Sequence, residues 1–409
     1  MDVHAYGAPR ALATVVPGEL PQGKRGAIQT ATLQWFAEHR RSVPWREEPS
    51  PYRVWVSEIM LQQTRTDTVL PYFRRWMRRF PTLGSLAGAD LGEVLKMWEG
   101  LGYYSRARNL HATARFVSAQ LGGELPDDPE ALRRLPGIGR YTANAIASIA
   151  FGKDVPVVDG NVSRVLSRLF AIESDITAAA TQERLWALAT ELLPRGKAAT
   201  FNQALMEFGS RVCTPRRPAC PRCTIRRWCA AYAAGSPEAY PRKKRRVVPR
   251  VAATLGVIWQ GDRVLVQRRP PQGFLGGLWE FPGGKRRGGE TLRACLRREL
   301  QEEVGYRGAI GPKVMTIEHG YSMFHVTLHA YECVLEGSVL RPKAAEWRWA
   351  TLEDLRDLPF PAANRRLLET LERRRGGLPV LTRRGSSRGA SGRASARGRR
   401  SRPLGSRPS

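Results

Sequence analysis

The hydrophobic periodicity of the chain changes near residue 250, and this change constrains the fold more than any other feature. Before Cys213, apolar residues recur with the 3.6-residue period of amphipathic helices, separated by Gly, Pro and Asp. The segments that predict helices are Ile28–Arg41, Tyr52–Thr64, Thr68–Phe80, Ala143–Ala150 and Thr181–Leu193. After Val251, two segments instead predict strands joined by a turn at 260–262, namely Ala253–Trp259 and Arg263–Arg268. The sequence therefore predicts an all-α domain followed by a domain that contains strands.

Positive charge is the second distinctive feature, because the 409 residues carry a formal net charge of +29. From Arg373 onward there are twelve arginines and no acidic residue, a composition typical of a disordered segment. This tail is equally consistent with attraction to phosphates and with a solubilising extension. A second basic run, Arg242–Arg246, lies between Pro241 and Pro249 and predicts an interdomain linker. The charge indicates a polyanionic partner such as nucleic acid, but it does not indicate a chemistry.

The chain has no sequence signal for a membrane or for secretion. No apolar run approaches the ~18 residues that a membrane span needs, and Met1–Gly26 lacks the continuous apolar region of a signal peptide. Four of the six cysteines lie between Cys213 and Cys229, while Cys295 and Cys333 stand alone. Because this is not the even distribution of a disulfide framework, we expect a reduced intracellular compartment.

The four clustered cysteines, Cys213, Cys220, Cys223 and Cys229, indicate a metal centre. Four thiolates this close along the chain can surround one centre, and both iron–sulfur clusters and tetrahedral zinc use such a set. Their spacing leaves both alternatives open, with two short disulfides as a third possibility. The neighbouring arginines predict that this loop also touches phosphate.

A second motif is the sequence Leu135–Arg140, in which Gly137 and Gly139 flank one apolar residue between two helix-forming segments. Two glycines so placed allow a sharp turn and expose consecutive N–H groups at a helix N-terminus, where a DNA phosphate binds well. Gly-Ile-Gly alone fits a plain helix–helix turn equally well. The full Leu-Pro-Gly-Ile-Gly sequence in a basic, helical chain predicts a helix-hairpin-helix motif.

Two carboxylates stand in contrasting sequence environments. Glu58 lies within a largely apolar helical segment, where desolvation favours the neutral form that suits a general acid. Asp159 follows an apolar stretch and precedes a predicted helix, whose N-terminus we expect to keep it ionised. One neutral and one charged carboxyl are the pattern that glycosidic bond cleavage requires. Taken singly, each residue also fits an ordinary structural role.

Residues 27–235 resemble the MutY family of adenine DNA glycosylases. The similarity is carried by five segments in the family's order, which are Ser57–Thr64, Gly100–Leu110, Leu135–Arg140, Val158–Val162 and the four cysteines. The resemblance implies a [4Fe–4S] cluster at Cys213, Cys220, Cys223 and Cys229 and removal of adenine mispaired with 8-oxoguanine or guanine in double-stranded DNA. It also implies a monomeric, cytoplasmic, nucleoid-associated bacterial protein.

The same resemblance assigns roles to individual residues. Glu58 would protonate the leaving adenine, Asp159 would stabilise the sugar cation, and Tyr141 and Asn161 would support these two carboxylates. Gln62, Gln63 and Thr64 would probe the lesion pair, Tyr103 would wedge into the duplex, and Gly137, Gly139 and Arg140 would contact DNA. Bifunctional relatives such as endonuclease III have a lysine at the position of Tyr141, so we expect a glycosylase without efficient lyase activity. A catalytically inactive lesion sensor is the competing hypothesis, and the presence of both Glu58 and Asp159 argues against it.

The C-terminal half contains a pattern that fits the Nudix box. Gly284 and Glu290 are followed by Arg298-Glu299-Leu300-Gln301-Glu302-Glu303-Val304-Gly305. On a helix, Glu299, Glu302 and Glu303 share one face, where three carboxylates can hold Mg²⁺ against a diphosphate. A solvated acidic helix face is the alternative. Tyr306 departs from the aliphatic residue that usually follows the final glycine.

Residues 251–372 resemble the MutT family of Nudix hydrolases, in which the position of Asn364 contacts an oxidised base. In MutY proteins a similar domain reads 8-oxoguanine through a Phe-Ser-His loop. Here that loop is Tyr321-Ser322-Met323, so Ser322 persists and the histidine does not. Two hypotheses follow: the domain recognises 8-oxoguanine in DNA, which we take as its primary role, or it also hydrolyses 8-oxo-dGTP with Mg²⁺.

Together these features predict a multidomain chain with an all-α helix-hairpin-helix glycosylase fold and an α+β Nudix fold. The expected parts are a disordered segment at 1–26, the glycosylase domain at 27–235 with its iron–sulfur loop at 213–229, a basic linker at 236–250, the Nudix domain at 251–372 and a disordered Arg-rich tail at 373–409.

Overall fold

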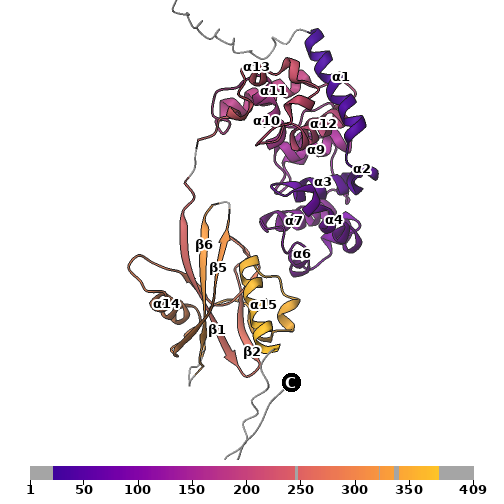
Figure 1. Ribbon diagram of the computed structural model, residues 1–409. Coiled ribbons are helices and arrows are strands. Elements are labelled where there is room, and N and C mark those ends of the chain that lie inside the picture. The colour runs from indigo at the N-terminus through magenta and orange to yellow at the C-terminus, as the bar shows by residue number, and fades with distance from the viewer. Residues whose placement is uncertain (1–21, 245–246, 322, 336–339, 377–409) are drawn as a thin grey trace, which may run out of the picture.

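The computed structural model describes residues 22–244, 247–321, 323–335 and 340–376, and it folds them into a helical domain and a sheet-containing domain (Figure 1). This confirms the predicted fold class. The helices of the first domain are α1 (Gln22–His39), α2 (Pro44–Glu47), α3 (Pro51–Leu61), α4 (Thr66–Arg79), α5 (Leu83–Ala87), α6 (Leu91–Met97), α7 (Ser105–Gln120), α8 (Pro129–Arg133), α9 (Arg140–Ile149), α10 (Gly160–Leu169), α11 (Ala179–Leu192), α12 (Ala198–Arg211) and α13 (Ala230–Ala233). The cysteine loop contains two short 3₁₀ turns, η1 (Cys220–Arg222) and η2 (Arg226–Trp228), and a third, η3 (Pro237–Ala239), lies after it.

The helical domain has two hydrophobic cores. One core lies among α2 to α9 and includes the fully buried Trp55, Phe73, Trp76 and Trp98. The other lies among α1, α10, α11 and α12 and includes the buried Val162, Leu166, Phe201 and Phe208. The chain passes from the second core through the first and back to the second, and α9 of the first core packs against α12 of the second.

Helix α3 shows why the predicted boundaries were close but not correct. Ser50 caps its N-terminus by accepting a hydrogen bond from the backbone N–H of Arg53, and Pro51 occupies the first turn, where its missing N–H costs nothing. The helix ends at Leu61, so the prediction that it continues to Thr64 was wrong. Gln63 has a left-handed backbone with φ of 57°, which no α-helix accommodates.

The predicted helix-hairpin-helix is present between α8 and α9. Asp128 caps α8 by accepting the backbone N–H of Ala131 at 2.7 Å. Gly137 has φ of +74°, and a Cβ built there would lie 2.5 Å from the Cβ of Asn109. Gly139 is the N-cap of α9 with ordinary extended φ, and a Cβ there meets nothing within 4 Å. The two glycines therefore have different roles: Gly137 makes the turn, and Gly139 leaves the helix N-terminus open.

We expect Gly137→Ala to lower the stability of the domain by about 1–3 kcal/mol, because alanine is strained at positive φ and collides with Asn109. For a domain of this size the melting temperature should fall by about 3–8 °C in a thermal unfolding experiment. Gly139→Ala, in the same turn, is the matched control and should change the melting temperature by less than about 2 °C. Equal effects of the two substitutions would contradict this assignment.

The C-terminal domain is built on one mixed sheet. Its strands are β1 (Arg250–Gln260), β2 (Arg263–Arg268), β3 (Trp279–Glu280), β4 (Gly283–Lys285), β5 (Ile310–Gly320), β6 (His325–Cys333) and β7 (Trp347–Thr351). The order is β3-β2-β1-β6-β5, with β4 also paired to β1 and β7 to β2. Strands β1 and β6 run parallel, while the other pairs are antiparallel. The predicted β1–β2 hairpin is confirmed.

Two helices cover opposite faces of this sheet, α14 (Leu292–Val304) and α15 (Ala362–Gly376) (Figure 1). Neighbouring residues of β1 demonstrate this, since Val257 packs in the core beneath α15 while Ile258 packs in the core beneath α14. The alternation follows from the two-residue period of a strand, whose successive side chains point to opposite faces. A 3₁₀ turn, η4 (Asp354–Arg356), precedes α15.

Three predicted boundaries need correction. Helix α1 begins at Gln22, so the end of the predicted disordered segment 1–26 is helical, and residues 1–21 lie outside the described residues. The first part of the predicted linker 236–250 packs on the helical domain, because Tyr240 is buried and the carbonyl of Arg242 accepts the N–H of Ile176 at 2.9 Å. Helix α15 continues through Gly376, beyond the predicted boundary at 373. The rest of the predicted tail, 377–409, lies outside the described residues.

Within the described residues, the structure contains no helix with the length and apolar character needed to cross a membrane.

Candidate functional site

The four predicted catalytic residues meet between the two helical cores. Glu58 is on α3, Tyr141 is on α9, and Asp159 and Asn161 are at the N-terminus of α10. The Tyr141 hydroxyl donates a hydrogen bond to Oε2 of Glu58, and the side-chain amide of Asn161 donates to Oδ2 of Asp159 at 2.8 Å. Both Glu58 and Tyr141 interact electrostatically with Asp159. The structure therefore brings together residues that are far apart in the sequence.

Glu58 is placed as an acid that can hold a proton near neutral pH. Its side chain is buried, with 4% of the residue exposed, and this burial raises its pKa from the usual 4.5 to about 7. The hydrogen bond from Tyr141 and the positive charge of Arg46 oppose the rise, while the nearby Asp159 adds to it. Since Tyr141 occupies Oε2, the other carboxyl oxygen is left to exchange a proton.

Asp159 is the N-cap of α10 and accepts the backbone N–H of Val162 at 2.6 Å. We expected this helix terminus to keep the carboxyl ionised. The donors from Val162 and Asn161 and the charge of Arg164 lower the pKa of Asp159, but burial is the larger influence and the pKa is raised. Asp159 nevertheless receives more donors than Glu58, so it is the member of the pair that is better prepared to carry the charge.

Arg164 connects this site to the cysteine loop, which the sequence did not reveal. Its guanidinium donates to Oδ1 of Asn161 at 2.8 Å, to the carbonyl of Gly209 at 2.7 Å and to the carbonyl of Cys213 at 2.7 Å. Asn161 in turn donates to Asp159. A single arginine thus fixes the amide that orients the catalytic carboxylate, and it ties that amide to the first cysteine.

A buried carboxylate on α12, Glu207, is a further residue that the sequence analysis missed. Its side chain has no exposure and is paired with Arg46 at 2.5 Å and with Arg41 at 3.0 Å. Burial alone would raise the pKa of Glu207, but the two arginines more than compensate and the pKa is lowered. Glu207 holds the Arg46 guanidinium whose charge acts on Glu58. A lone acid among apolar residues at helical spacing, such as Phe201, Leu205 and Phe208, is the sequence signal that could have revealed it.

The predicted lesion-probing residues lie in two strained turns. Gln63 and Tyr103 both have left-handed backbones, with φ of 57° and 48°, and Tyr103 is 40% exposed. The side-chain amide of Gln62 donates to the hydroxyl of Thr142 at 3.3 Å, and the hydroxyl of Thr64 donates to the carbonyl of Gln62 at 3.4 Å. Non-glycine residues in this region are held by their surroundings, and such strain is concentrated at functional sites.

The hairpin presents an open helix terminus. No side chain caps α9 at Gly139, so its first backbone N–H groups remain available to an anion. Arg140, which we expected to contact DNA, is paired with Glu183 at 2.9 Å and stacks over the ring of Trp186. Its guanidinium is therefore engaged within the protein, although both members of the pair are partly exposed.

The four clustered cysteines line one cavity beside α10. None is in a disulfide, and Arg168 donates to the sulfur of Cys213 at 3.3 Å. Among the described residues, no three His, Cys, Asp or Glu side chains are grouped so as to hold a single metal ion. A cavity lined by four thiols fits the four-cysteine ligand set of a multi-iron cluster.

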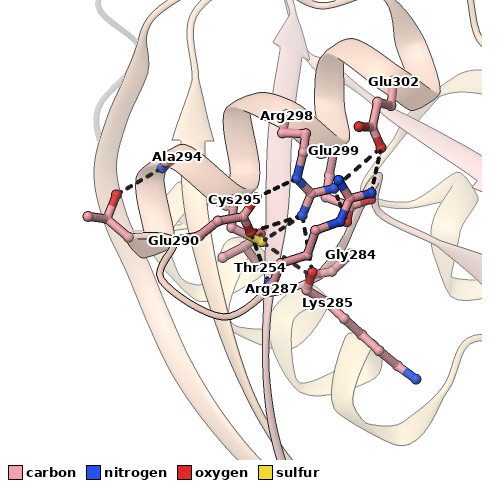
Figure 2. Close-up of polar contacts among 11 residues, drawn as sticks. Thr254, Gly284, Lys285, Arg287, Glu290, Ala294, Cys295, Arg298, Glu299 and Glu302 are labelled. Atoms are coloured by element: carbon pink, nitrogen blue, oxygen red, sulfur yellow. Dashed lines mark hydrogen bonds and ion pairs between the residues drawn. The ribbon is translucent and has the colours of Figure 1, made fainter.

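The Nudix-box residues form a network of ion pairs on α14 (Figure 2). Arg298 contacts Glu290 at 2.6 Å, Glu299 at 2.7 Å and Glu302 at 3.3 Å. Arg287 also pairs with Glu302, at 3.7 Å. These guanidinium groups neutralise two of the three carboxylates that we expected to bind Mg²⁺.

The third carboxylate, Glu303, points toward the sheet instead. Its Oε2 accepts the side-chain amide of Gln267 at 2.8 Å and the backbone N–H of Gly283 at 3.0 Å, and burial raises its pKa. Since the grouping required for an ion is not formed among the described residues, the structure does not support the predicted Mg²⁺ site at Glu299, Glu302 and Glu303. Nor does any observation favour hydrolysis of 8-oxo-dGTP.

The predicted base-reading residues of the C-terminal domain are differently placed. Asn364 is buried and its side-chain oxygen accepts the backbone N–H of Phe281 at 3.3 Å, an internal contact. Ser322 lies outside the described residues. Next to it, Tyr321 belongs to an aromatic cluster with Phe274 and Phe324, at ring distances of 4.9 and 5.2 Å. Phe274 is 44% exposed and Met323 is 61% exposed, so this end of the domain presents an apolar surface.

Comparison with known proteins agrees with this architecture. The family model for the HhH-GPD superfamily of base excision DNA repair proteins matches residues 56–191, and the NUDIX domain model matches residues 254–370. The human adenine DNA glycosylase is 36% identical over 407 residues, which cover 85% of this chain and 74% of the relative. The mouse adenine DNA glycosylase is 37% identical, covering 88% and 80%.

A bacterial relative, the adenine DNA glycosylase of Buchnera aphidicola subsp. Schizaphis graminum, is 30% identical over 82% of this chain and 96% of its own length. The similarity therefore extends through both domains and across mammalian and bacterial relatives. Because it coincides with a helix-hairpin-helix domain joined to a Nudix domain, the chain belongs to the adenine DNA glycosylase family of base excision DNA repair proteins.

Proposed function

We propose that this protein hydrolyses the N-glycosidic bond of adenine mispaired with 8-oxoguanine or guanine in double-stranded DNA. The observation that carries the proposal is the buried Glu58, paired with Tyr141 and set beside Asp159. A carboxyl with a pKa near 7 next to a second carboxylate that accepts more hydrogen bonds is the arrangement that separates an acid role from a charge-stabilising role. Both domains and the whole set of catalytic residues are in one chain, which supports a monomeric enzyme.

Glu58 supplies the proton in this proposal. When the flipped adenine enters the site, the protonated carboxyl donates to a ring nitrogen, so that the base leaves as a neutral molecule. Tyr141 holds the opposite oxygen and fixes the direction of the transfer. After the base leaves, the carboxylate of Glu58 can accept a proton from the water that attacks the sugar.

Asp159 stabilises the positive charge that develops on the sugar as the bond breaks. Asn161 and the backbone N–H of Val162 hold its two oxygens in place, so no reorientation is needed in the transition state. Asp159 can also bond transiently to the sugar cation. Tyr141 stands where a lyase would need an amine nucleophile, and we therefore propose that the DNA strand is left unbroken.

Several features of the helical domain hold DNA in this proposal. We infer that the open N-terminus of α9 at Gly139 binds a backbone phosphate. Gln62, Gln63 and Thr64 contact the mispair, and the exposed Tyr103 enters the stack from its own turn. The net charge of +29 provides the non-specific attraction that brings a nucleoid-associated enzyme to DNA.

The C-terminal domain, in this proposal, recognises 8-oxoguanine through the segment around Tyr321-Ser322-Met323. The exposed Met323 and the aromatic cluster of Tyr321, Phe274 and Phe324 provide a surface on which a base can stack. The test compares single-turnover rates of adenine release from duplexes in which adenine faces 8-oxoguanine or guanine. Faster release opposite 8-oxoguanine is expected, and equal rates would refute lesion recognition.

We further propose that Cys213, Cys220, Cys223 and Cys229 ligate a [4Fe–4S] cluster. The cluster would add stability to the loop, since binding it closes a segment of short 3₁₀ turns around one group.

Replacing Cys213 by serine should remove the bound iron and the visible absorbance of the purified protein, and it should destabilise the helical domain. Iron content and the absorption spectrum are the measurements. Cys333→Ser replaces a buried cysteine of the other domain and should leave both unchanged. Full retention of iron in Cys213→Ser, or stoichiometric zinc in the wild-type protein, would contradict the cluster assignment.

A further inference from the structure

The two domains contact each other at Phe360, whose backbone N–H and carbonyl both form hydrogen bonds across the interface. The carboxylate of Glu99 accepts the N–H of Phe360 at 3.1 Å, and the hydroxyl of Tyr104 donates to the carbonyl of Phe360 at 3.2 Å. Glu99 and Tyr104 flank the turn 100–103, which carries the proposed wedge residue Tyr103. The C-terminal domain therefore forms hydrogen bonds with the residues at both ends of that turn.

A charged pair strengthens the contact. The guanidinium of Arg365, on α15, donates to the same Glu99 oxygen at 2.9 and 2.7 Å and lies 5.3 Å from the ring centroid of Phe360. The Glu99 and Arg365 side chains are only 17% and 18% exposed. Charged hydrogen bonds in such partly desolvated positions are stronger than those at an open surface.

Apolar packing shows that the contact is part of a continuous interface. Leu278 of the C-terminal domain is fully buried and packs in the same core as the helices α2 to α9. Arg108, on α7, donates to the carbonyl of Gly276 at 2.9 Å and to that of Gly273 at 3.3 Å. Figure 1 shows α15 close to α6 at this junction. The packing of Leu278 and the hydrogen bonds of Arg108 therefore add to the contact at Phe360 and extend the interface between the domains.

The turn that this interface holds is strained. Gly100 and Gly102 have φ of +100° and +69°, and Tyr103 has φ of 48°. A strained turn persists only when its surroundings determine it, so contacts at its two ends influence where Tyr103 lies.

Arg106 connects the turn to the catalytic helix. Its guanidinium is buried and donates to the carbonyls of Leu101 and Gly102 at 3.0 and 3.2 Å. The same guanidinium donates to three carbonyls at the end of α3, those of Ile59 at 2.8 Å, Met60 at 3.1 Å and Gln62 at 2.6 Å. These follow Glu58 directly in the chain. One side chain therefore joins the Tyr103 turn to the segment that carries the general acid and the lesion-probing residues.

We propose that Glu99, Tyr104 and Arg365 are positioning residues that couple the docking of the C-terminal domain to adenine release. When the C-terminal domain docks at Phe360, it fixes the conformation of the Tyr103 turn. Because Arg106 binds carbonyls of both segments, the fixed turn also restrains the end of α3. The inference rests on the proposed function, in which the C-terminal domain recognises 8-oxoguanine. It adds that this recognition acts on catalysis through Phe360, so the contact determines specificity for the lesion pair.

The test uses the full chain with Tyr104→Phe, Arg365→Gln and the double variant. Tyr104→Phe removes the hydroxyl that reaches Phe360 and the backbone of Gly100, and Arg365→Gln removes one of the two positive charges on Glu99, leaving Lys96 at 2.8 Å. Glu372→Gln is the matched control, because Glu372 is on the same helix as Arg365 and its arginine partner, Arg356 of η4, belongs to the C-terminal domain. Single-turnover rates are measured with adenine opposite 8-oxoguanine and opposite guanine, at saturating enzyme.

We expect each single variant to slow release opposite 8-oxoguanine about tenfold, the effect of losing one hydrogen bond to a charged or buried group. Release opposite guanine should change by less than about twofold, since that substrate gives the C-terminal domain no lesion to recognise. In the double variant the loss should be smaller than the product of the two single losses, because both contacts act through Phe360. Arg365→Lys, which keeps the charge, should recover part of the rate.

Two results would overturn the coupling: unchanged rates opposite 8-oxoguanine in both single variants, or equal losses on the two substrates. Thermal unfolding of each variant separates a loss of folding from a loss of positioning, and the near-isosteric Tyr104→Phe is decisive if Arg365→Gln unfolds. If the wild-type protein itself does not distinguish 8-oxoguanine from guanine, the proposed lesion recognition fails, and the coupling fails with it. If the wild type distinguishes them and the variants do so equally well, only the coupling is wrong.

Discussion

Glu58→Gln is expected to slow adenine release by about 10²–10⁴-fold, the range in which a positioned general acid contributes. Glutamine keeps the size of the side chain and can still accept the Tyr141 hydroxyl, but it has no acidic proton to give. The measurement is single-turnover release from a duplex with one adenine–8-oxoguanine pair. Duplex affinity, measured separately, should change by less than about threefold, because the substitution removes no phosphate contact.

Glu93→Gln is a suitable control, since it removes a carboxylate of the same domain that is paired at the surface with Arg79. It should retain the wild-type rate. A Glu58→Gln rate within tenfold of wild type would show that the proton comes from another group.

The rate of adenine release should depend on pH through the protonation of Glu58. Burial raises the pKa of Glu58 to about 7, and the acid role needs its protonated form. The wild-type rate should therefore fall as pH rises through about 7, and in Glu58→Gln this fall should disappear, leaving a flat profile over that range. A wild-type rate that increases with pH through this range would give Glu58 the role of a base instead.

Asp159→Asn has the second large expected effect, a loss of about 10²–10³-fold in adenine release, because the sugar cation loses a preorganised negative charge. The substitution isolates the charge, since asparagine caps a helix N-terminus as well as aspartate does and can still accept the N–H of Val162. Single-turnover kinetics and thermal unfolding are measured together. A large loss of rate with little change in melting temperature is the expected combination.

Asp128→Asn provides the matched control, because Asp128 is also a helix N-cap, on α8, and is not one of the four residues of the site. It should leave the rate of adenine release unchanged. If Asp159→Asn unfolds the protein while Asp128→Asn does not, the capping role of Asp159 would be its main one.

The sequence predicted the residues of the site better than it predicted their environment. Local signals identified Glu58 in an apolar helix and Asp159 before a new helix, because burial and capping depend on neighbours along the chain. The direction of the Asp159 pKa could not be obtained in this way. It depends on how deeply the packing of α10 against α12 buries the carboxyl, which is a tertiary property.

The sequence did not reveal the roles of Arg164 and Arg106, because these roles also depend on tertiary contacts. Arg164 and Arg106 act through backbone carbonyls of distant segments, and a carbonyl is present at every position, so no residue pattern marks such partners. The Nudix helix is a second case in which the surroundings of the residues could not be predicted. Its spacing placed three glutamates on one face, but the ion pairs of Arg298 and Arg287 and the inward turn of Glu303 could be seen only in three dimensions.

Helix ends followed local chemistry where a cap was present. Ser50 and Pro51 define the start of α3, whereas its end depends on Gln62–Thr64 leaving the helix to form a strained turn that Arg106 holds. The predicted tail boundary failed because Arg373, Arg374 and Arg375 are compatible with a helix that is stabilised by the apolar face of α15 against the sheet.

The most direct measurement of the central claim is a single-turnover reaction of the wild-type protein with a duplex that contains one adenine opposite 8-oxoguanine. We predict that free adenine is released, that the abasic strand remains unbroken until it is treated with alkali, and that adenine opposite thymine is left in place. Absence of released adenine under conditions where the duplex is fully bound would contradict it.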